Sequence, residues 1–237
     1  MKLSDRLETV LSFVAPVKAA ADIGTDHGHV PVELVRRGIA ARAYAMDVRK
    51  GPLSRASENI RSAGLEERIE TRLSDGAEKL RAGEVGAVII AGMGGELIIH
   101  ILEQGRHLWD TVDQWVLSPH SEIGKVRGWL HENGFPIKRE AMVFEEGKYY
   151  TVLDVGKKSQ ASELPKPETF VYGEYLIRER DPVFAEYLKE EERKLAALAD
   201  NLRKQAETSA RATESLRETE ARLRKNQEVQ NEMHGNY

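Results

Sequence analysis

Nearly continuous apolar runs alternate with amphipathic stretches along the first 155 residues of the chain. Runs such as "KAAADIG" (residues 18–24) and "GAVIIAGMGG" (86–95) are typical of parallel strands that are buried on both faces. Stretches such as "HVPVELVRRG" (29–38) place apolar residues at helical spacing. We therefore predict strands at 18–24, 40–48, 68–76, 86–95 and 114–120, helices at 3–14, 29–38, 51–64, 95–109 and 124–134, and two closing strands around Glu146-Gly147.

This alternation predicts the fold class. Strand–helix repeats over about 150 residues indicate an α/β protein with a doubly wound, mostly parallel sheet. The two closing strands are expected to add an antiparallel strand at one edge. Ligands of such sheets bind outside the carboxyl ends of the strands. Most of the candidate site residues follow a predicted strand, so we expect a site at that edge.

The sequence changes character after Val155. Residues 156–168, "GKKSQASELPKPE", are typical of a polar linker. The remainder is rich in Glu, Arg, Ala, Leu and Lys, with Gly173 and Pro182 as its breakers. We predict a domain at 1–155, a linker at 156–168 and a helical coiled-coil domain at 169–237.

Within the tail, leucines recur in steps of seven, with Ser209 in the missing place, and a weaker row accompanies them. The polar break near Ser209 favours an antiparallel helical hairpin, and one long dimerising helix is the alternative. The leucine row is Leu188, Leu195, Leu202, Leu216 and Leu223, and the companion row is Leu198, Ala206, Ala212 and Thr219.

Composition narrows the function classes. The 237 residues include no cysteine, which excludes disulfides and thiol nucleophiles and suits a reducing cytoplasm, where we expect the protein. The net charge of -4 argues against a strongly basic nucleic-acid binder but leaves room for a local basic face. Neither a signal peptide nor a membrane span is evident, so we expect no membrane partner. We favour a monomer.

The loop "DIGTDHG" follows the first predicted strand. Asp26 occupies the place of the second glycine in the dinucleotide-binding fingerprint, which disfavours an NAD-dependent oxidoreductase. Asp22 and Asp26 around Gly24 suit a cationic ligand, such as the ammonium and sulfonium of S-adenosylmethionine. The alternative is a plain strand–helix turn with Asp26 as a helix cap.

Two further acids end the next strands. Asp47 lies about 20 residues beyond the first loop, where a carboxylate accepts from the ribose hydroxyls of an adenosine ligand. Asp75 ends the third strand and is placed to accept from an adenine amino group. A helix cap and a simple Asp-Gly turn, respectively, are the alternatives.

The fourth and fifth strands end in "AGMGG" (91–95) and "LSPH" (117–120). Gly92, Met93 and Gly94 leave an open floor where two ligands can meet, with the thioether as a soft apolar contact. Ser118 and His120 are candidates for the opposite wall, although Ser-Pro often only starts a loop.

Together these motifs resemble the bacterial tRNA (adenine-N1)-methyltransferases that act at adenosine 22. The resemblance rests on "LSDRL", "DIGTDHGHVP", "MDV", "SDG", "AGMGG", "LSPH…VRGWLHENGF" and "EEGKYYTV", and covers roughly Leu3 to Val155. It implies a Rossmann-like, S-adenosylmethionine-dependent enzyme with tRNA as substrate. This chain departs from the family where Gly28 and His29 stand, since the family often has a larger residue there, and at Ser118-Pro119-His120, where the family often has Gln-Pro-Asn; substrate roles for Ser118 and His120 are therefore not carried over from the resemblance. By resemblance, Asp22, Gly24, His27 and Gly28 take the methionine end of the donor, Asp47 and Val48 the ribose, and Asp75 and Gly76 the adenine.

The implied reaction needs no metal and no strong base, because neutral adenine N1 has a lone pair and the sulfonium activates the methyl group. Asp26 is the candidate that stabilises the positive charge of the product, and Met93 and Gly94 are the floor under the target base. For RNA, phosphate contacts are expected from basic residues near the proposed cleft, about half of which we expect to be ordinary surface charges. A coiled-coil RNA-binding or interaction protein with a catalytically silent domain is the alternative function. The basic residues are Lys2, Arg6, Arg36, Arg37, Arg49, Lys50 and Arg55.

Overall fold

A computed structural model describes residues 3–159, 167–206 and 209–235, and its first part alternates strands and helices as predicted. The chain divides into two compact units, with the boundary between Val171 and Tyr172. The strands, all in the first unit, are β1 (Val17–Ile23), β2 (Ala40–Asp47), β3 (Ile69–Leu73), β4 (Ala87–Met93), β5 (Gln114–Pro119), β6 (Ile137–Glu145) and β7 (Lys148–Gly156). The helices among them are α1 (Asp5–Phe13), α2 (His29–Arg36), α3 (Lys50–Ser62), α4 (Gly95–Gln104), the short 3-10 helix η1 (Arg106–Leu108) and α5 (Ile123–Glu132).

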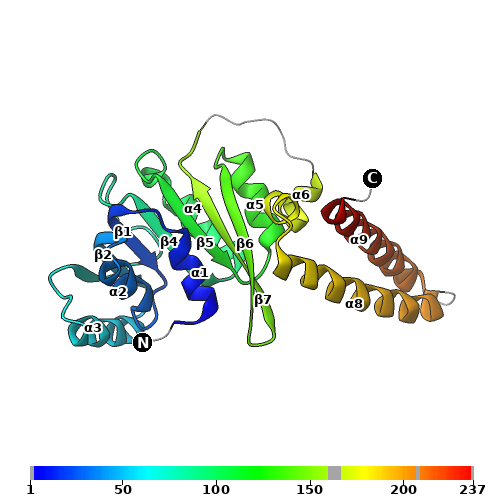
Figure 1. Ribbon diagram of the computed structural model, residues 1–237, viewed down its shortest axis with the longest axis horizontal. Helices are drawn as coiled ribbons and strands as arrows, with labels where there is room; N and C mark the ends of the chain where they lie inside the picture. The colour runs from blue at the N-terminus through cyan, green and yellow to red at the C-terminus, as the bar shows by residue number, and fades with distance from the viewer. Residues whose placement is uncertain (1–2, 160–166, 207–208, 236–237) are drawn as a thin grey trace. The chain divides into compact units, whose positions relative to one another are not determined.

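The seven strands form one sheet in the order β3-β2-β1-β4-β5-β7-β6 (Figure 1). Strands β1 to β5 pair in parallel, and β7 pairs antiparallel with both β5 and β6. The predicted fold class, a doubly wound and mostly parallel sheet with an antiparallel addition at one edge, is confirmed. Because β6 runs in the same direction as β5, the turn between β6 and β7 lies at the edge where the parallel strands end.

Helices cover both faces of the sheet, which explains why the central strands β1, β4 and β5 are largely apolar on both faces. On one face, Ile89 of β4 and Val116 of β5 pack with Leu11 of α1 and Leu34 of α2. On the other face, the adjacent side chains of β4 and β5 pack against α4 and α5, because successive residues of a strand point to opposite sides. The residues of that second face include Ile90, Leu117, Ile98, Leu102, Val126 and Leu130.

The helix predicted at 95–109 is interrupted. Gly105 ends α4, and the next residues form the 3-10 helix η1. Trp109 still packs on this face, where its indole N–H donates to the carbonyl of Leu102 at 2.9 Å. The chain therefore turns after Gly105, and this turn places the tryptophan where its polar atom has a partner in the core.

The remaining helices are α6 (Pro167–Tyr172), α7 (Glu174–Arg178), α8 (Pro182–Ala206) and α9 (Ala210–His234). In the second unit α8 and α9 pack antiparallel, as the contacts of Arg203 with Glu220 and of Leu188 with Asn226 require. Leu198 was placed wrongly in the companion row: 47% of it is exposed, and Ala199 is buried instead. The coiled coil and the domain limits stay predictions, and residues 160–166 of the linker lie outside the described residues. No helix in the described residues is long and apolar enough to cross a bilayer.

Glu191 is the centre of a buried polar network in the second unit. Its carboxylate accepts from Tyr172 at 2.7 Å, Tyr187 at 2.9 Å and Asn226 at 3.0 Å, and it pairs with Arg222. These donors come from α6, α8 and α9, so one carboxylate links three helices.

Replacing Glu191 with alanine is expected to destabilise the second unit by about 1–3 kcal/mol, because the change leaves the buried donors of Tyr172 and Asn226 without their acceptor. Hydrogen exchange of the α8 and α9 amides measures the effect. Glu214→Gln is the control, because Glu214 is exposed and pairs with Arg217 one turn away on the same helix. Equal protection in both variants would contradict the role of the network.

Candidate functional site

The first glycine loop is fixed to the neighbouring strand. The amides of Gly24 and Thr25 both donate to the carbonyl of Met46 at 2.8 Å. Gly24 has φ of +80° and Gly28 has φ of +69°, a region that favours glycine. Gly28 precedes α2, and a Cβ added to it would lie 3.1 Å from Ala56 of α3. The loop therefore turns tightly between β1 and α2 and packs against α3.

Two buried carboxylates lie at the ends of adjacent strands. Asp22 of β1 and Asp47 of β2 are each only 6% exposed. Burial raises the pKa of Asp22 to about 6, and the nearby negative charge of Asp47 contributes in the same direction. Asp47 accepts from the backbone N–H of Arg49 at 2.7 Å. The sequence predicted both residues, and their shared buried position makes the site attractive to a positively charged group.

Exposed apolar side chains adjoin Asp47. Val48 is 58% exposed and Leu73 is 46% exposed, and Leu73 pairs with Asp47 across the β2–β3 ladder. The predicted acid Asp75 is exposed beside them, and Gly76 turns the chain with φ of +49°. Leu73 was not predicted as a site residue, although an apolar residue directly before "SDG" was the available signal. These side chains provide an apolar surface next to a carboxylate, which suits a nucleoside.

Asp26 lies in a different environment from the two buried acids. It is 61% exposed, and it accepts from the guanidinium of Arg55 on α3 at 2.6 Å. That hydrogen bond holds the pKa of Asp26 below its usual value. Beside it, the half-exposed ring of His27 stacks on His29 at 5.4 Å. An exposed carboxylate that is neutralised by arginine is poorly suited to stabilise a cationic product, so the geometry disfavours the predicted catalytic role.

The end of β4 carries the residues predicted to form an open floor, and of these Gly92 is exposed while Met93 and Gly94 are half-buried. Gly92 has φ of +90° and lies where the β4–β5 register shifts, which is a bulge beside the site. The Met93 side chain reaches across to the first loop, where its methyl group fills the space above Gly24. Gly94 precedes α4, and a Cβ on Gly95 would lie 2.6 Å from the carbonyl of Ser121. Gly95 therefore allows close packing, and Met93 connects the end of β4 to the first loop, while the open floor stays a prediction.

The two residues predicted at the end of β5, Ser118 and His120, lie in different environments. Ser118 is completely buried, so it cannot contact a substrate in this conformation, and its predicted role is not supported. His120 is exposed, and its backbone N–H donates to the Met93 carbonyl at 2.8 Å. Arg6 reaches the same place from α1, with its guanidinium 5.3 Å from the ring centre of Tyr150. Tyr150 was missed by the sequence analysis.

Several of the cations considered as phosphate ligands are occupied. Arg37 pairs with Glu8 and Glu33, Arg36 also pairs with Glu33, and Arg49 lies 3.5 Å from Asp47. Arg55 pairs with Asp26, as described above. Lys2 lies outside the described residues. Sequence proximity to the site was therefore a weak guide to which cations are available for RNA.

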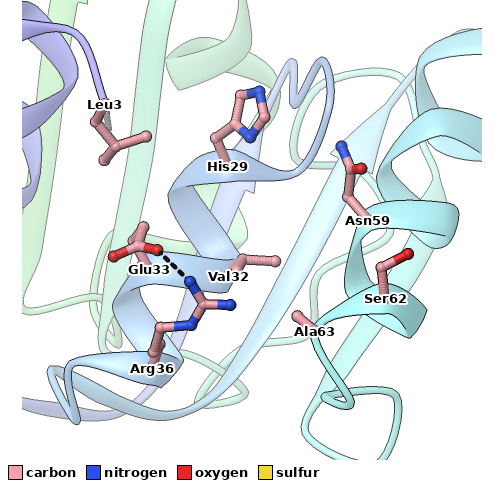
Figure 2. Close-up of a pocket in the computed structure, with 8 residues that line it drawn as sticks. All are labelled: Leu3, His29, Val32, Glu33, Arg36, Asn59, Ser62 and Ala63. Carbon is pink, nitrogen blue, oxygen red and sulfur yellow. Dashed lines mark hydrogen bonds and ion pairs between the residues drawn. The ribbon is translucent and has the colours of Figure 1, made fainter. Parts of the chain in front are cut away.

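A pocket of about 230 Å³ lies between α2 and α3 (Figure 2). Of the residues predicted for the site, Arg36, a candidate phosphate contact, lines this pocket, and the predicted donor-binding and catalytic residues do not. Its wall residue Asn59 donates to the backbone carbonyl of His27 at 2.9 Å and so supports the first loop. The lining residues are Leu3, His29, Val32, Glu33, Arg36, Asn59, Ser62 and Ala63.

Comparisons with known proteins indicate the family to which the fold corresponds. Residues 3–153 match the family described as a methyltransferase domain. The Bacillus subtilis tRNA (adenine(22)-N(1))-methyltransferase is 31% identical over 211 residues, covering 88% of this chain and 89% of that protein. A Streptococcus pneumoniae protein solved with S-adenosyl-L-methionine is 33% identical, with a TM-score of 0.85, covering 97% of this chain and 100% of that one. A Mycoplasma capricolum protein (M. capricolum TrmK), solved with S-adenosyl-homocysteine, is 25% identical with a TM-score of 0.81, covering 98% of this chain and 100% of that one.

Proposed function

The chain belongs to the tRNA (adenine(22)-N(1))-methyltransferase family, and on this premise we propose how its own residues perform the reaction. The enzyme transfers a methyl group from S-adenosylmethionine to N1 of an adenosine in tRNA. The observation that carries the assignment of the donor site is the pair of buried carboxylates, Asp22 and Asp47, at the strand ends. A donor with an ammonium and a sulfonium fits this pair, because its positive charges compensate the negative charges of the buried carboxylates.

The donor, when bound, supplies an electrophilic methyl group. We assign its methionine end to Asp22 and to the Gly24 loop, its ribose hydroxyls to Asp47, and its adenine to the apolar surface of Val48 and Leu73. Asp22 lies in a buried position where charge interactions are stronger than in water. The chain therefore aligns the donor through charge at one end and apolar contact at the other.

Methyl transfer to adenine N1 is then a matter of alignment. The N1 lone pair is available in the neutral base, so the protein has to orient the two reactants and exclude water. Met93 and Gly94 are the floor on which the base meets the donor, since Met93 already touches the Gly24 loop. A base that is stacked in folded RNA has to be unstacked to reach this floor, at a cost of a few kcal/mol. We expect no metal to be required, and a monomer remains the favoured state.

Asp26 and Arg55 are proposed to hold the first loop against α3. Asp26→Asn and Arg55→Gln are each expected to weaken S-adenosylmethionine binding by a similar factor of about threefold, as for an exposed ion pair worth below about 1 kcal/mol. The double variant is expected to lose no more than either single variant, because both changes break one interaction. Calorimetric titration measures the affinity for S-adenosylmethionine, and single-turnover rates measure methyl transfer. A large loss of turnover in Asp26→Asn alone would restore the role of Asp26 as the residue that stabilises the product charge.

The substrate assignment is tested on two tRNA transcripts that differ only at nucleotide 22. With adenosine at that position, incubation with S-adenosylmethionine is expected to yield 1-methyladenosine in the nucleoside digest. With guanosine there, the digest is expected to contain none. Methylation of both transcripts, or of neither, would contradict the assignment.

A further inference from the structure

A second group of side chains, those of Arg6, His120 and Tyr150, meets beside Gly92. The ring centre of His120 lies 5.1 Å from that of Tyr150, and the Arg6 guanidinium lies 5.3 Å from the same tyrosine ring. A Cβ added to Gly92 would be 3.7 Å from the His120 ring and 3.9 Å from Arg6 Nη1. Side chains from α1, from the loop that follows β5, and from β7 therefore converge beside Gly92, which has no side chain of its own.

The strand topology explains why Tyr150 reaches this place. The antiparallel β5–β7 pairing ends at Leu117 and Leu153, so residues 148–152 of β7 continue beyond the last paired residue of β5. The same register, continued by three residues, places Tyr150 opposite His120. In Figure 1 the β6–β7 turn extends past the neighbouring strands. The hairpin thus adds an aromatic wall to the edge where Asp22 and Asp47 lie.

Arg6 has an unused donor at this wall. Its Nη1 atom is buried and has no hydrogen-bond partner among residues 3–159, 167–206 and 209–235. A buried guanidinium N–H without an acceptor is costly, which indicates that a ligand supplies the acceptor. Arg6 is also near enough to Asp22 for its charge to act on that carboxylate. The wall therefore borders the place assigned to the methyl donor.

His120 is suited to contact a base that becomes positively charged. Partial desolvation holds the pKa of His120 below its ordinary value, and the charges of Arg6 and Lys148 act in the same direction, so the neutral imidazole is favoured at pH 7. A neutral imidazole adds no second positive charge beside Arg6 at the place where the product cation forms. Aromatic rings next to an arginine fork are the usual partners of unstacked bases in RNA.

Resting on the proposed methyltransferase function, we propose that Arg6, His120 and Tyr150 form the receptor for the unstacked target adenine. The base stacks against the His120 and Tyr150 rings. Arg6 Nη1–H donates to a ring nitrogen of the base other than N1, which stays free to attack. These are positioning contacts, and they decide whether the base is presented to the methyl donor.

The test uses the full-length protein and a tRNA transcript with 2-aminopurine at nucleotide 22, bound with S-adenosyl-homocysteine present. Its fluorescence reports the unstacking of that base. Tyr150→Leu is expected to abolish the fluorescence change and to lower kcat/KM for unlabelled tRNA by about ten- to a hundredfold, since aromatic stacking with a base contributes that much. Affinity for S-adenosylmethionine is expected to stay within about twofold, which also shows that the variant is folded.

Tyr150→Phe is expected to retain both signals, because the ring remains. Tyr175→Leu is the matched control: Tyr175 also contacts an arginine, Arg178 at 4.3 Å, but it lies in the second unit. Arg6→Lys separates base from phosphate recognition, because lysine replaces arginine as a phosphate ligand better than as a planar donor beside an aromatic ring.

A tenfold loss in Arg6→Lys with an unchanged affinity for the donor supports base recognition, and full activity of Arg6→Lys would overturn it. Unchanged fluorescence and kcat/KM in Tyr150→Leu would overturn the proposal, as would an equal loss of donor binding. Failure of the proposed function can be distinguished from failure of the base receptor, because in the first case the wild type itself would produce no 1-methyladenosine.

Discussion

Replacing Asp22 with asparagine is expected to weaken S-adenosylmethionine binding by roughly ten- to a hundredfold, the effect of losing a hydrogen bond to a charged group. The same change is expected to stabilise the ligand-free protein. The buried carboxyl has a pKa of about 6, above its unfolded value, so the native state binds the proton more tightly. Tighter proton binding by the native state stabilises it, and this stabilisation is fully present at pH values below the unfolded pKa. It is lost as the pH rises through about 6, and it is absent at pH 7.

A shift of this size corresponds to at most about 3 kcal/mol, and we expect a gain of about 1–3 kcal/mol in the free energy of unfolding at pH 7. Calorimetric titration gives the affinity, and urea unfolding without ligand gives the stability. Asp113→Asn is the control, because that acid is 77% exposed and lies 3.8 Å from Lys157. If Asp22→Asn lost stability as well as affinity, Asp22 would be a structural residue and not a ligand for the donor.

Gly92→Ala is expected to lower turnover on tRNA by about tenfold or more and to leave donor binding within about twofold. A φ of +90° strains any residue with a Cβ, by roughly 1–3 kcal/mol. The added methyl group would also lie beside His120 and Arg6, on the side assigned to the target base. Steady-state rates with tRNA, together with calorimetric titration of the donor, separate the two effects.

Gly38→Ala is the matched control for this variant. Gly38 has φ of +70°, and a Cβ there would meet nothing within 4 Å, so the change imposes similar backbone strain after α2, among residues not assigned to the site. It is expected to lower stability and to leave the rates of the folded enzyme unchanged. Full activity of Gly92→Ala, or the same loss in both variants, would contradict a role of Gly92 in receiving the base.

The fold could be predicted because its strands are short, apolar and separated by amphipathic helices. The positions of Asp22 and Asp47 followed from the same pattern, since parallel strands end at one edge of the sheet. The pattern along the chain does not say which side chain pairs with which. Arg55 lies 29 residues after Asp26, and only the packing of α3 against the loop brings them together.

Other residues depended on the tertiary arrangement. Tyr150 reaches the site because β7 inserts between β5 and β6, which the order of strands along the chain does not reveal. Ser118 lies in a motif at the end of β5, but its side chain is in the fully buried part of that strand. Leu198 and Ala199 occupy neighbouring places on α8, and the sequence spacing alone favoured the larger apolar residue.

The most direct test of the account is calorimetric titration of the wild type and Asp22→Asn with S-adenosylmethionine at about pH 7.5 and pH 5.5. We expect the wild type to bind the donor several-fold more weakly at the lower pH, because Asp22 becomes protonated as the pH falls below its pKa of about 6. The variant is expected to bind weakly and equally at both values. An absence of binding by the wild type at pH 7.5, or the same pH dependence in the variant, would contradict the claim that buried carboxylates at the sheet edge hold a cationic methyl donor.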